Sequence, residues 1–279
     1  MDDLTFLEII HLLSVGIATY NIRAHVPSNV ATHNQIIPAE NLKSQKQLHE
    51  INQWTHKMKM KLNESKTKNM IFNYSKKNQF TTNLSVNGKQ IELVEETKLL
   101  GTYITKDLKW NKNTKELVKN GYKRMQLLHR AAGFTSNRED LKSIYLTYVR
   151  SALEQSAVVW HSILSARNRR DLERVQKAAL RVILQNNYTS YKSGLRKLNL
   201  QTLNKRREEL CLKFAKKCLK NDKVRDLFPK NKSKHRMKKR KVKLFKTNTQ
   251  RYKKSAIPYM QELLNKENAE KTMILKGEM

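Results

Sequence analysis

The apolar residues that follow Trp110 recur every three or four positions, and this spacing constrains the fold more than any other feature of the sequence. The first series places small or apolar side chains on one helical face: Val118, Gly121, Met125, Leu128 and Ala132. Similar series mark residues 172–183 and 203–219. Side chains at this spacing share one face of an α-helix, so the chain after Trp110 is predicted to form a bundle of amphipathic helices.

A further helix is predicted to begin at Leu141 and to extend to about Trp160. Its first apolar positions are Leu141, Ile144, Tyr145 and Tyr148. The polar segment GFTSNRED, residues 133–140, separates it from the helix before. Ser136 or Asn137 can cap the second helix, because a short polar side chain accepts hydrogen bonds from the free N–H groups at a helix start.

Residues 1–110 predict a mixture of helix and strand. After Pro38, a helical stripe is formed by Leu48, Ile51, Trp54, Met58 and Leu62. Short strands are expected at residues 70–72 and, along KLLGTYIT, at residues 98–105. Between them, Asn87-Gly88 lies within the alternating stretch NLSVNGKQIELV and predicts a hairpin, since both residues tolerate the positive φ angles of a two-residue turn.

The run LTFLEIIHLLSVGIATY, residues 4–20, is the one sequence candidate for membrane insertion. It contains Glu8 and His11 and lacks a clean apolar stretch of about 18 residues, so we expect a buried strand followed by a helix or loop, and no transmembrane segment. Cys211 and Cys218 are too far apart along a helix to form a disulfide and are predicted to be buried core thiols. This cysteine usage favours an intracellular protein, nuclear or cytoplasmic, over a secreted one.

The chain contains 57 Lys and Arg against 24 Asp and Glu, which gives a net charge of +33 with neutral histidines. Repulsion at this charge opposes compaction, so the positive surface is expected to bind a polyanion. Nucleic acid is the leading partner, because each neutralised phosphate releases a counterion, and an anionic membrane surface is the alternative. The helical residues expected to follow a nucleic-acid backbone are Lys123, Arg124, Arg130, Arg169, Arg170, Lys205, Arg206 and Arg207.

From Pro229 the composition becomes strongly basic. Residues 230–246, KNKSKHRMKKRKVKLFK, hold ten Lys or Arg and no acid, and are predicted to be disordered without a partner. Four of them form a run with the composition of a nuclear import signal: Lys238, Lys239, Arg240 and Lys241. A nuclear import receptor is therefore a candidate partner, with nonspecific nucleic-acid binding as the alternative. One short amphipathic helix is expected after Pro258.

Several motifs occur in an order that resembles a polymerase. MDDLTF, residues 1–6, resembles the end of the aromatic-x-Asp-Asp signature of a polymerase palm, and KLNESKTKNMIF, residues 61–72, the next palm motif. ETKLLGTYITKDLKW, residues 96–110, resembles the primer-grip strand pair. LEQSAVVWHSIL, LERVQKAALRVI and RREELCLKFAKKC resemble a helical thumb and post-thumb region. Together, over about residues 1–228, they resemble the reverse transcriptases of non-long-terminal-repeat (LINE-like) retrotransposons, in particular the jockey-like group.

The resemblance implies RNA-directed DNA synthesis on an RNA template and a DNA primer. Asp2 and Asp3 would bind Mg²⁺, which clamps the attacking hydroxyl and the leaving pyrophosphate. Lys66 or Lys68 would place a cation beside the pyrophosphate. The same lysine could also act as the general acid that donates a proton to the departing pyrophosphate. The residues that would position the primer end are Lys98, Leu99, Leu100 and Gly101.

The family also requires a third metal-binding carboxylate and a fingers region, and both would precede Met1. We therefore expect this chain to be inactive alone. The alternative function is that of a non-enzymatic, basic, helical nucleic-acid-binding relic of a decayed retroelement. In that case Asp2 and Asp3 are solvated terminal residues, and Lys66 is an ordinary surface lysine.

Four aromatic or imidazole side chains have both a functional and a structural interpretation. Trp54, Trp110 and Trp160 could stack on bases, but each lies within an apolar pattern that favours core packing. His161 follows Trp160, and no neighbouring residue in the sequence supports a role as ligand or base. A structural histidine is expected.

The predicted fold class is α+β and predominantly helical. Residues 1–110 are expected to form a truncated palm, a small antiparallel sheet and one helix, that includes the primer-grip-like hairpin. Residues 111–228 are expected to form an all-α thumb and post-thumb bundle, and residues 229–279 a basic tail with one short helix.

Overall fold

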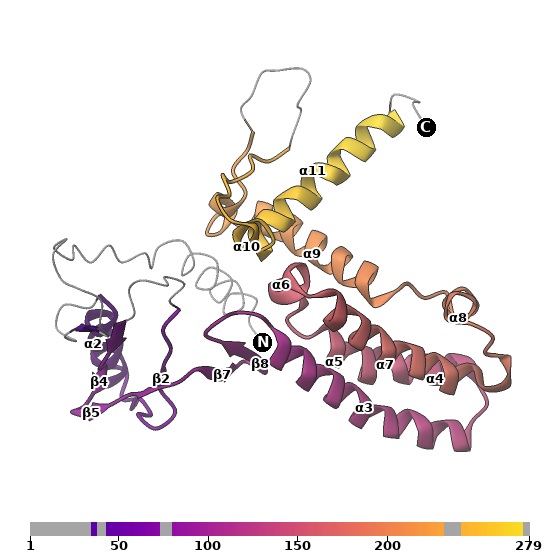
Figure 1. The fold of residues 1–279 in the computed structure, drawn as a ribbon, viewed down its shortest axis with the longest axis horizontal. Coiled ribbons are helices and arrows are strands. Elements are labelled where there is room, and N and C mark those ends of the chain that lie inside the picture. Colours follow the sequence, from indigo (N-terminus) through magenta and orange to yellow (C-terminus); the bar gives the residue numbers. More distant parts are fainter. Residues whose placement is uncertain (1–34, 38–42, 73–79, 232–240, 276–279) are drawn as a thin grey trace. The chain divides into compact units, whose positions relative to one another are not determined.

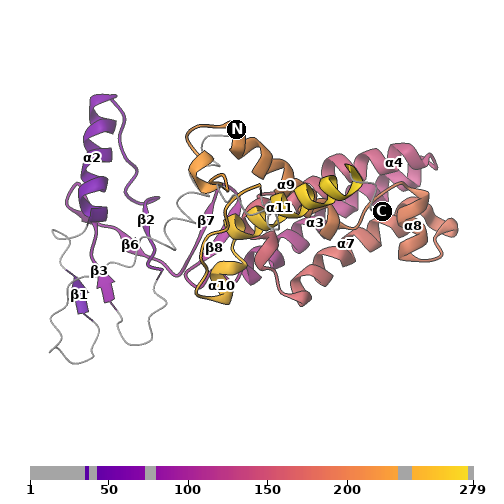
Figure 2. The same cartoon turned by 90° about the horizontal axis from the view of Figure 1, so that it is seen from above.

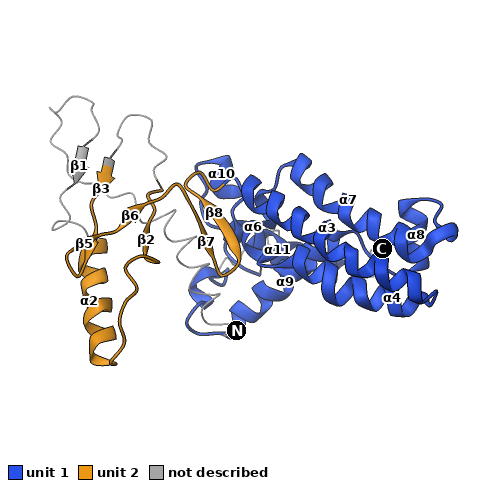
Figure 3. Ribbon diagram, turned by 90° about the horizontal axis from the view of Figure 1, so that it is seen from below, with its two compact units in different colours: residues 1–16, 109–279 blue, residues 17–108 orange. Residues whose placement is uncertain are grey.

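The computed structural model describes residues 35–37, 43–72, 80–231 and 241–275 (Figure 1). The chain divides into two compact units: a sheet unit, residues 17–108, and a helical unit, residues 1–16 and 109–279 (Figure 3). Helices dominate the described residues and the strands are two to four residues long. The prediction of a predominantly helical α+β chain is therefore confirmed at this level, while the assignment of palm and thumb stays a prediction.

The described part of the helical unit is a set of packed helices. They are α3 (Asn111–Phe134), α4 (Arg138–Ile144), α5 (Ser151–Glu154), α6 (Ala157–Trp160), α7 (Ala166–Leu184), α8 (Tyr191–Lys197), α9 (Leu203–Lys220), α10 (Gln250–Lys253) and α11 (Ala256–Leu275). Helix α3 packs along α7, α7 also contacts α9, and α9 contacts α11, as Figures 1 and 2 show from two directions. The helices predicted from apolar spacing near residues 118–132, 172–183 and 203–219 correspond to α3, α7 and α9.

Helix α3 buries one face along most of its length. The buried residues are Asn113, Thr114, Leu117, Gly121, Met125 and Leu128. Gly121 marks the closest approach, because a Cβ added there would lie 2.8 Å from Leu153 Cδ2 and 3.0 Å from Val175 Cγ1. The missing side chain at Gly121 therefore lets α3 lie directly against α5 and α7.

The second predicted helix is interrupted, so the expectation of one helix from Leu141 to Trp160 is wrong. The segment contains α4, a π-helix η2 (Tyr145–Arg150), α5 and α6. Ser156 adopts a left-handed conformation, with φ of 53°, which ends the continuous path before α6. The start of the segment, at α4, was predicted correctly. The side chain of Asn137 caps α4 by accepting a hydrogen bond from the backbone N–H of Glu139 at 3.1 Å.

The interior of the helical unit contains several residues that the sequence patterns predict to be buried. Cys211 and Cys218 are free, buried thiols on α9, as predicted. Trp110 and Trp160 are buried in the core, as predicted. The indole Nε1 of Trp160 donates a hydrogen bond to the carbonyl oxygen of Gln155 at 3.0 Å.

Part of the segment predicted as a separate tail belongs to the helical unit. Helix α11 is 20 residues long, more than the short helix expected, and it packs against α9. The side-chain amide of Asn265 bonds both backbone polar groups of buried Val242, each at 3.0 Å. Lys230 and Val242 form a β-bridge, so the prediction of disorder over residues 230–246 is wrong at these two positions. Lys238, Lys239 and Arg240 lie outside the described residues, and for them disorder stays a prediction.

The described part of the sheet unit contains helix α2 (Lys43–Lys57) and four short strand pairs. Two pairs are parallel, β1 (Gln35–Ile37) with β3 (Phe80–Thr82) and β2 (Lys68–Asn69) with β6 (Glu92–Leu93). Two are antiparallel, β4 (Ser85–Val86) with β5 (Lys89–Gln90) and β7 (Glu96–Leu99) with β8 (Thr102–Thr105). The β4–β5 hairpin turns at Asn87-Gly88, with φ angles of 51° and 76°, which confirms the hairpin prediction.

Three strand predictions need correction. The small antiparallel sheet expected within residues 1–110 is, among the described residues, a set of separate two-stranded pairs, two of which are parallel. The single strand that the apolar pattern predicts over residues 98–105 is a hairpin, which agrees with the strand pair implied by the resemblance for residues 96–110. Leu100 and Gly101 both have positive φ, 46° and 82°, and reverse the chain between β7 and β8. The strand expected at residues 70–72 lies earlier, at Lys68–Asn69, where it pairs with β6.

Only part of the stripe predicted for helix α2 is packed against other residues. Its Leu48 packs, together with Leu62, against the small cluster formed by Leu84, Val86 and Ile91. Trp54 is 53% exposed, and Ile51 and Met58 are also exposed, so the prediction of core packing for Trp54 is wrong. The physical reason is size: this cluster covers only one side of the helix.

The contact at Gly121 generates the first testable prediction. We expect Gly121→Val to lower the free energy of unfolding by about 1–3 kcal/mol, because the added atoms overpack a filled site between α3 and α7. Gly133→Val is the matched control on the same helix, where an added Cβ meets nothing within 4 Å. Urea unfolding of both variants measures the difference, and an equal loss in the two would show that packing at Gly121 is not the cause.

Candidate nucleic-acid interface

Helix α3 presents a cationic face to solvent. Its sequence holds six Lys or Arg and one Glu. Because the face through Gly121 and Met125 packs inward, the side chains of Lys119, Lys123 and Arg130 lie on the exposed side. Such a face offers an array of cations to phosphate groups.

A surface hollow of about 510 Å³ lies on this face, and we call it the α3 hollow. Its lining residues are Asn120, Lys123, Arg124, Gln126, Leu127, Arg130 and Tyr148. Three of the basic residues predicted to bind nucleic acid, Lys123, Arg124 and Arg130, are therefore brought together in one place. Two side-chain amides, one aliphatic side chain and one aromatic ring complete the lining.

Arg124 is held in place by Tyr148. Its guanidinium carbon lies 4.9 Å from the centroid of the Tyr148 ring, within the range of a cation–π contact. The same guanidinium donates a hydrogen bond from Nη1 to the carbonyl oxygen of Tyr148 at 2.8 Å. Two contacts with one residue fix the side chain and reduce the entropy lost when it binds a ligand.

The π-helix η2 turns Tyr148 outward. Tyr145 and Val149 are buried within it, whereas Tyr148 is 43% exposed. The hydroxyl of Ser151 donates to the carbonyl oxygen of Thr147 at 2.6 Å and approaches that of Tyr148 at 3.3 Å. Single π-turns within helices often occur at functional positions, so the location of η2 at the hollow supports a functional interpretation.

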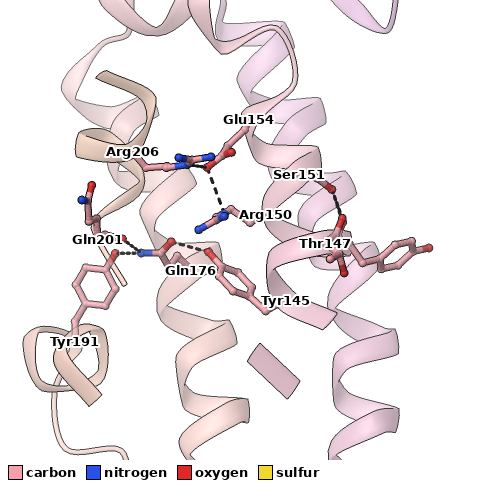
Figure 4. A network of polar contacts seen from close by, with 10 residues as sticks. Tyr145, Thr147, Arg150, Ser151, Glu154, Gln176, Tyr191, Gln201 and Arg206 are labelled. Atoms are coloured by element: carbon pink, nitrogen blue, oxygen red, sulfur yellow. Dashed lines mark hydrogen bonds and ion pairs between the residues drawn. The ribbon is translucent and has the colours of Figure 1, made fainter. Parts of the chain in front are cut away.

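A buried polar network anchors η2 from the inside (Figure 4). The hydroxyl of Tyr145 donates to Gln176 Oε1 at 2.6 Å, and Gln176 Nε2 donates to the Tyr191 hydroxyl at 2.8 Å and to the carbonyl oxygen of Gln201 at 2.9 Å. Burial raises the pKa of the Tyr145 hydroxyl, so this group remains a neutral donor. Gln176 on α7 thus connects η2 to the segment that precedes α9.

A second contact of the network uses one of the predicted basic residues. Glu154 accepts from Arg206 Nε at 3.2 Å and lies 3.5 Å from Arg150 Nε (Figure 4). Glu154 is mostly shielded from solvent, which strengthens both ion pairs relative to surface pairs. Arg206 therefore connects α9 to α5, the helix that follows η2, a structural contact that its sequence position did not reveal.

Arg207 lies inside the unit, which differs from the surface groove expected for it. Its Nε donates to His161 Nδ1 at 3.4 Å, and its guanidinium carbon lies 5.7 Å from the centroid of the Trp160 ring. Burial lowers the pKa of Arg207 to about 10. The side chain is fully shielded from solvent, so it cannot contact a phosphate in this conformation.

The remaining predicted basic residues do not gather at one point. Arg169 is half-buried and donates from Nη2 to the carbonyl oxygen of Ser162 at 3.5 Å. Arg170 and Lys205 are exposed on α7 and α9, and Lys241 is exposed. None of these residues lines the α3 hollow.

His161 is a core histidine, in agreement with the structural interpretation. Its ring lies 5.9 Å from that of Tyr259 in an edge-to-face arrangement and accepts the hydrogen bond of Arg207. Burial, with the positive charges of Arg207 and Arg169, lowers the pKa of His161 to about 3. The imidazole is neutral at physiological pH.

The structure describes only some of the residues expected to perform catalysis. Asp2 and Asp3, the expected Mg²⁺ ligands, lie outside the described residues. Among the residues that the structure describes, no three His, Cys, Asp or Glu side chains gather as ligands for a metal ion. Lys66 is exposed, with its backbone N–H bonded to Asn63 Oδ1 at 3.1 Å, and Lys68 forms an ion pair with Glu92 at 2.5 Å.

The four primer-grip-like residues meet at the turn of the β7–β8 hairpin. Lys98 Nζ lies 5.4 Å from the centroid of the Tyr103 ring on the facing strand. Leu99 and Leu100 are exposed at the turn, and Gly101 provides the second positive φ angle that the reversal requires. The hairpin thus presents two apolar side chains and one cation at its tip.

No protein-family model matches this chain, and no curated protein or solved structure matches it significantly. Within the described ranges, none of the helices is both long enough and apolar enough to cross a membrane. The candidate site therefore rests on its own geometry.

The lowered pKa of His161 makes stability depend on pH in a defined direction. Below about pH 6.5 the unfolded chain increasingly binds a proton at this residue and the folded chain does not, so the free energy of unfolding should fall by about 1.2 kcal/mol between pH 7.0 and pH 5.5. Urea titrations at pH 7.0 and 5.5 measure the loss. His161→Gln should reduce it, and His129→Gln, at an exposed position on α3, is the control. An undiminished loss in His161→Gln would contradict the assignment.

Proposed function

We propose that the helical unit binds nucleic acid along the cationic face of α3, with the α3 hollow as the centre of contact. The observation that supports this most directly is the convergence of Lys123, Arg124 and Arg130 in one hollow beside an exposed aromatic ring. Lys123 and Arg130 are exposed, and neither has a carboxylate partner among the ion pairs of the described residues. Their charges are therefore available to phosphates.

Within the resemblance to LINE-like reverse transcriptases, this face would grip the RNA template and DNA primer. Residues 1–110 would then be the end of the palm, the β7–β8 hairpin the primer grip, and the helices from α3 onward the thumb and post-thumb region. The exposed tip at Leu99 and Leu100 supports this proposal, since a primer-positioning hairpin must present its turn to the nucleic acid.

The chemistry that the resemblance implies is RNA-directed DNA synthesis with Mg²⁺. Asp2 and Asp3 would hold the ion, and Lys66 or Lys68 would neutralise the departing pyrophosphate. The ion pair with Glu92 occupies Lys68, so Lys66 is the better candidate of the two. The alternative proposal is a nucleic-acid-binding relic with no catalytic activity, which uses the same cationic face.

The grip can be tested by the salt dependence of binding. The ligand is an RNA–DNA hybrid, and the variant is Lys123→Ala/Arg130→Ala. We expect its slope of log affinity against log salt to become shallower by about one for each phosphate that the variant no longer neutralises. Lys213→Ala/Lys220→Ala is the control, because it removes the same net charge from exposed positions on α9 outside the hollow. Gel-shift titrations at several salt concentrations measure the slopes. Equal changes in both double variants would mean that only total charge matters.

The enzymatic proposal has a separate test. Primer extension by the whole chain on an RNA template with Mg²⁺ is expected to give no product, while salt-sensitive binding to the same template–primer remains. Asp2→Ala/Asp3→Ala is the control. Extension that disappears in this double variant would contradict the expectation and would show a complete polymerase site.

A further inference from the structure

The α3 hollow differs from a plain phosphate site in the kind of groups that surround its cations. Beside Lys123 and Arg130 lie the amides of Asn120 and Gln126, the ring of Tyr148 and the side chain of Leu127, which is 47% exposed. A phosphate alone needs only the cations. Amides can hydrogen-bond the edge of a base, and an aromatic ring can stack on its face.

Tyr148 has the properties of a stacking platform. An Arg guanidinium and an aromatic ring in contact form two flat groups on which a base can stack, and both kinds of group are used to bind unpaired bases. Here the pair is prepared in advance, because Arg124 is fixed by its 4.9 Å contact with the Tyr148 ring and by its 2.8 Å hydrogen bond to the Tyr148 carbonyl. The backbone beneath is held by buried Tyr145 and Val149.

The neighbouring aromatic side chains show what is particular to Tyr148. Tyr122, on the same helix as Lys123, is 46% exposed and thus as accessible as Tyr148, but it does not line the hollow. Tyr145 belongs to the same π-helix but is buried and bonded to Gln176. Tyr148 alone among these three combines exposure, a stacked Arg and adjacent amides.

We propose that the α3 hollow is a binding site for an unpaired nucleotide, with the base stacked on the Tyr148–Arg124 pair and its phosphates neutralised by Lys123 and Arg130. Bases inside a duplex are stacked on both faces and cannot reach such a platform, so the site distinguishes single-stranded from double-stranded nucleic acid. This inference rests on the proposed function and specifies its ligand: a single strand, or the single-stranded extension of a template beyond a primer.

The test compares single-stranded RNA with a blunt RNA–DNA hybrid of equal length, using the whole chain. We expect Tyr148→Leu to weaken single-strand binding by about ten- to a hundredfold, the range seen when a stacking aromatic residue is removed, and to leave hybrid binding and the salt slope unchanged. Tyr148→Phe keeps the ring and should bind within about twofold of the wild type. Tyr122→Leu is the matched control for loss of an exposed tyrosine and should have no effect.

A second variant and a second ligand make the outcome decisive. Arg124→Lys keeps the charge but removes the planar group, so it should reduce the preference for single strands even if Tyr148→Leu proves unstable in urea unfolding. Inorganic polyphosphate, which has no bases, should bind the wild type and Tyr148→Leu equally.

Three results would overturn the inference. They are equal losses in Tyr148→Leu and Tyr122→Leu, equal losses on single strand and hybrid, and a loss of polyphosphate binding in Tyr148→Leu. Failure of the proposed function looks different, because then Lys123→Ala/Arg130→Ala would change the salt slope no more than Lys213→Ala/Lys220→Ala does, whatever Tyr148→Leu does.

Discussion

The close packing of α3 against α5 and α7 at Gly121 determines which face of α3 carries its charges to solvent. A chain with a net charge of +33 cannot bury its cations freely, so the faces that do pack must be apolar or small. Gly121 provides such a face, since even a single Cβ would lie 2.8 Å from Leu153. With this side of α3 fixed inward, Lys123 and Arg130 lie outward, and the cationic face follows from the packing.

The polar interior has a second role, which is to hold the π-helix in place. Gln176 connects Tyr145 to Tyr191 and Gln201, and Glu154 connects Arg150 to Arg206. Because these hydrogen bonds and ion pairs are shielded from water, the loss of a polar contact is costly. The network thus holds η2 from its buried side, while Tyr148 lies on the exposed side of the same helix. In this way contacts in the core fix the position of a residue that lines the α3 hollow.

The apolar spacing of the sequence was sufficient to predict the long helices but not the irregular ones. Tyr148 belongs to the apolar series that begins at Leu141, so the spacing predicts an inward position for it beside Tyr145. In the structure Tyr148 is exposed, whereas Val149, four residues after Tyr145, is buried within η2. No residue pattern predicts this π-helix. Arg207 was predictable in principle, because it lies four residues from both Leu203 and Cys211 on the buried stripe of α9. Its charge predicts a surface position, whereas its place on the apolar stripe predicts burial, and the structure agrees with the stripe. For Trp54, the apolar spacing correctly predicted a helix, α2. The spacing does not predict how much of the surface of that helix is buried by neighbouring residues.

The most direct test of this account is photocrosslinking of the whole chain to single-stranded RNA that contains 4-thiouridine, followed by identification of the crosslinked residues by mass spectrometry. The account predicts that crosslinks concentrate on the α3 hollow, with Tyr148 among the modified residues. Crosslinks confined to the basic run Lys238–Lys241, with none on α3 or η2, would contradict it. In that case the helical unit would be a scaffold, and nucleic-acid binding would belong to the basic run alone.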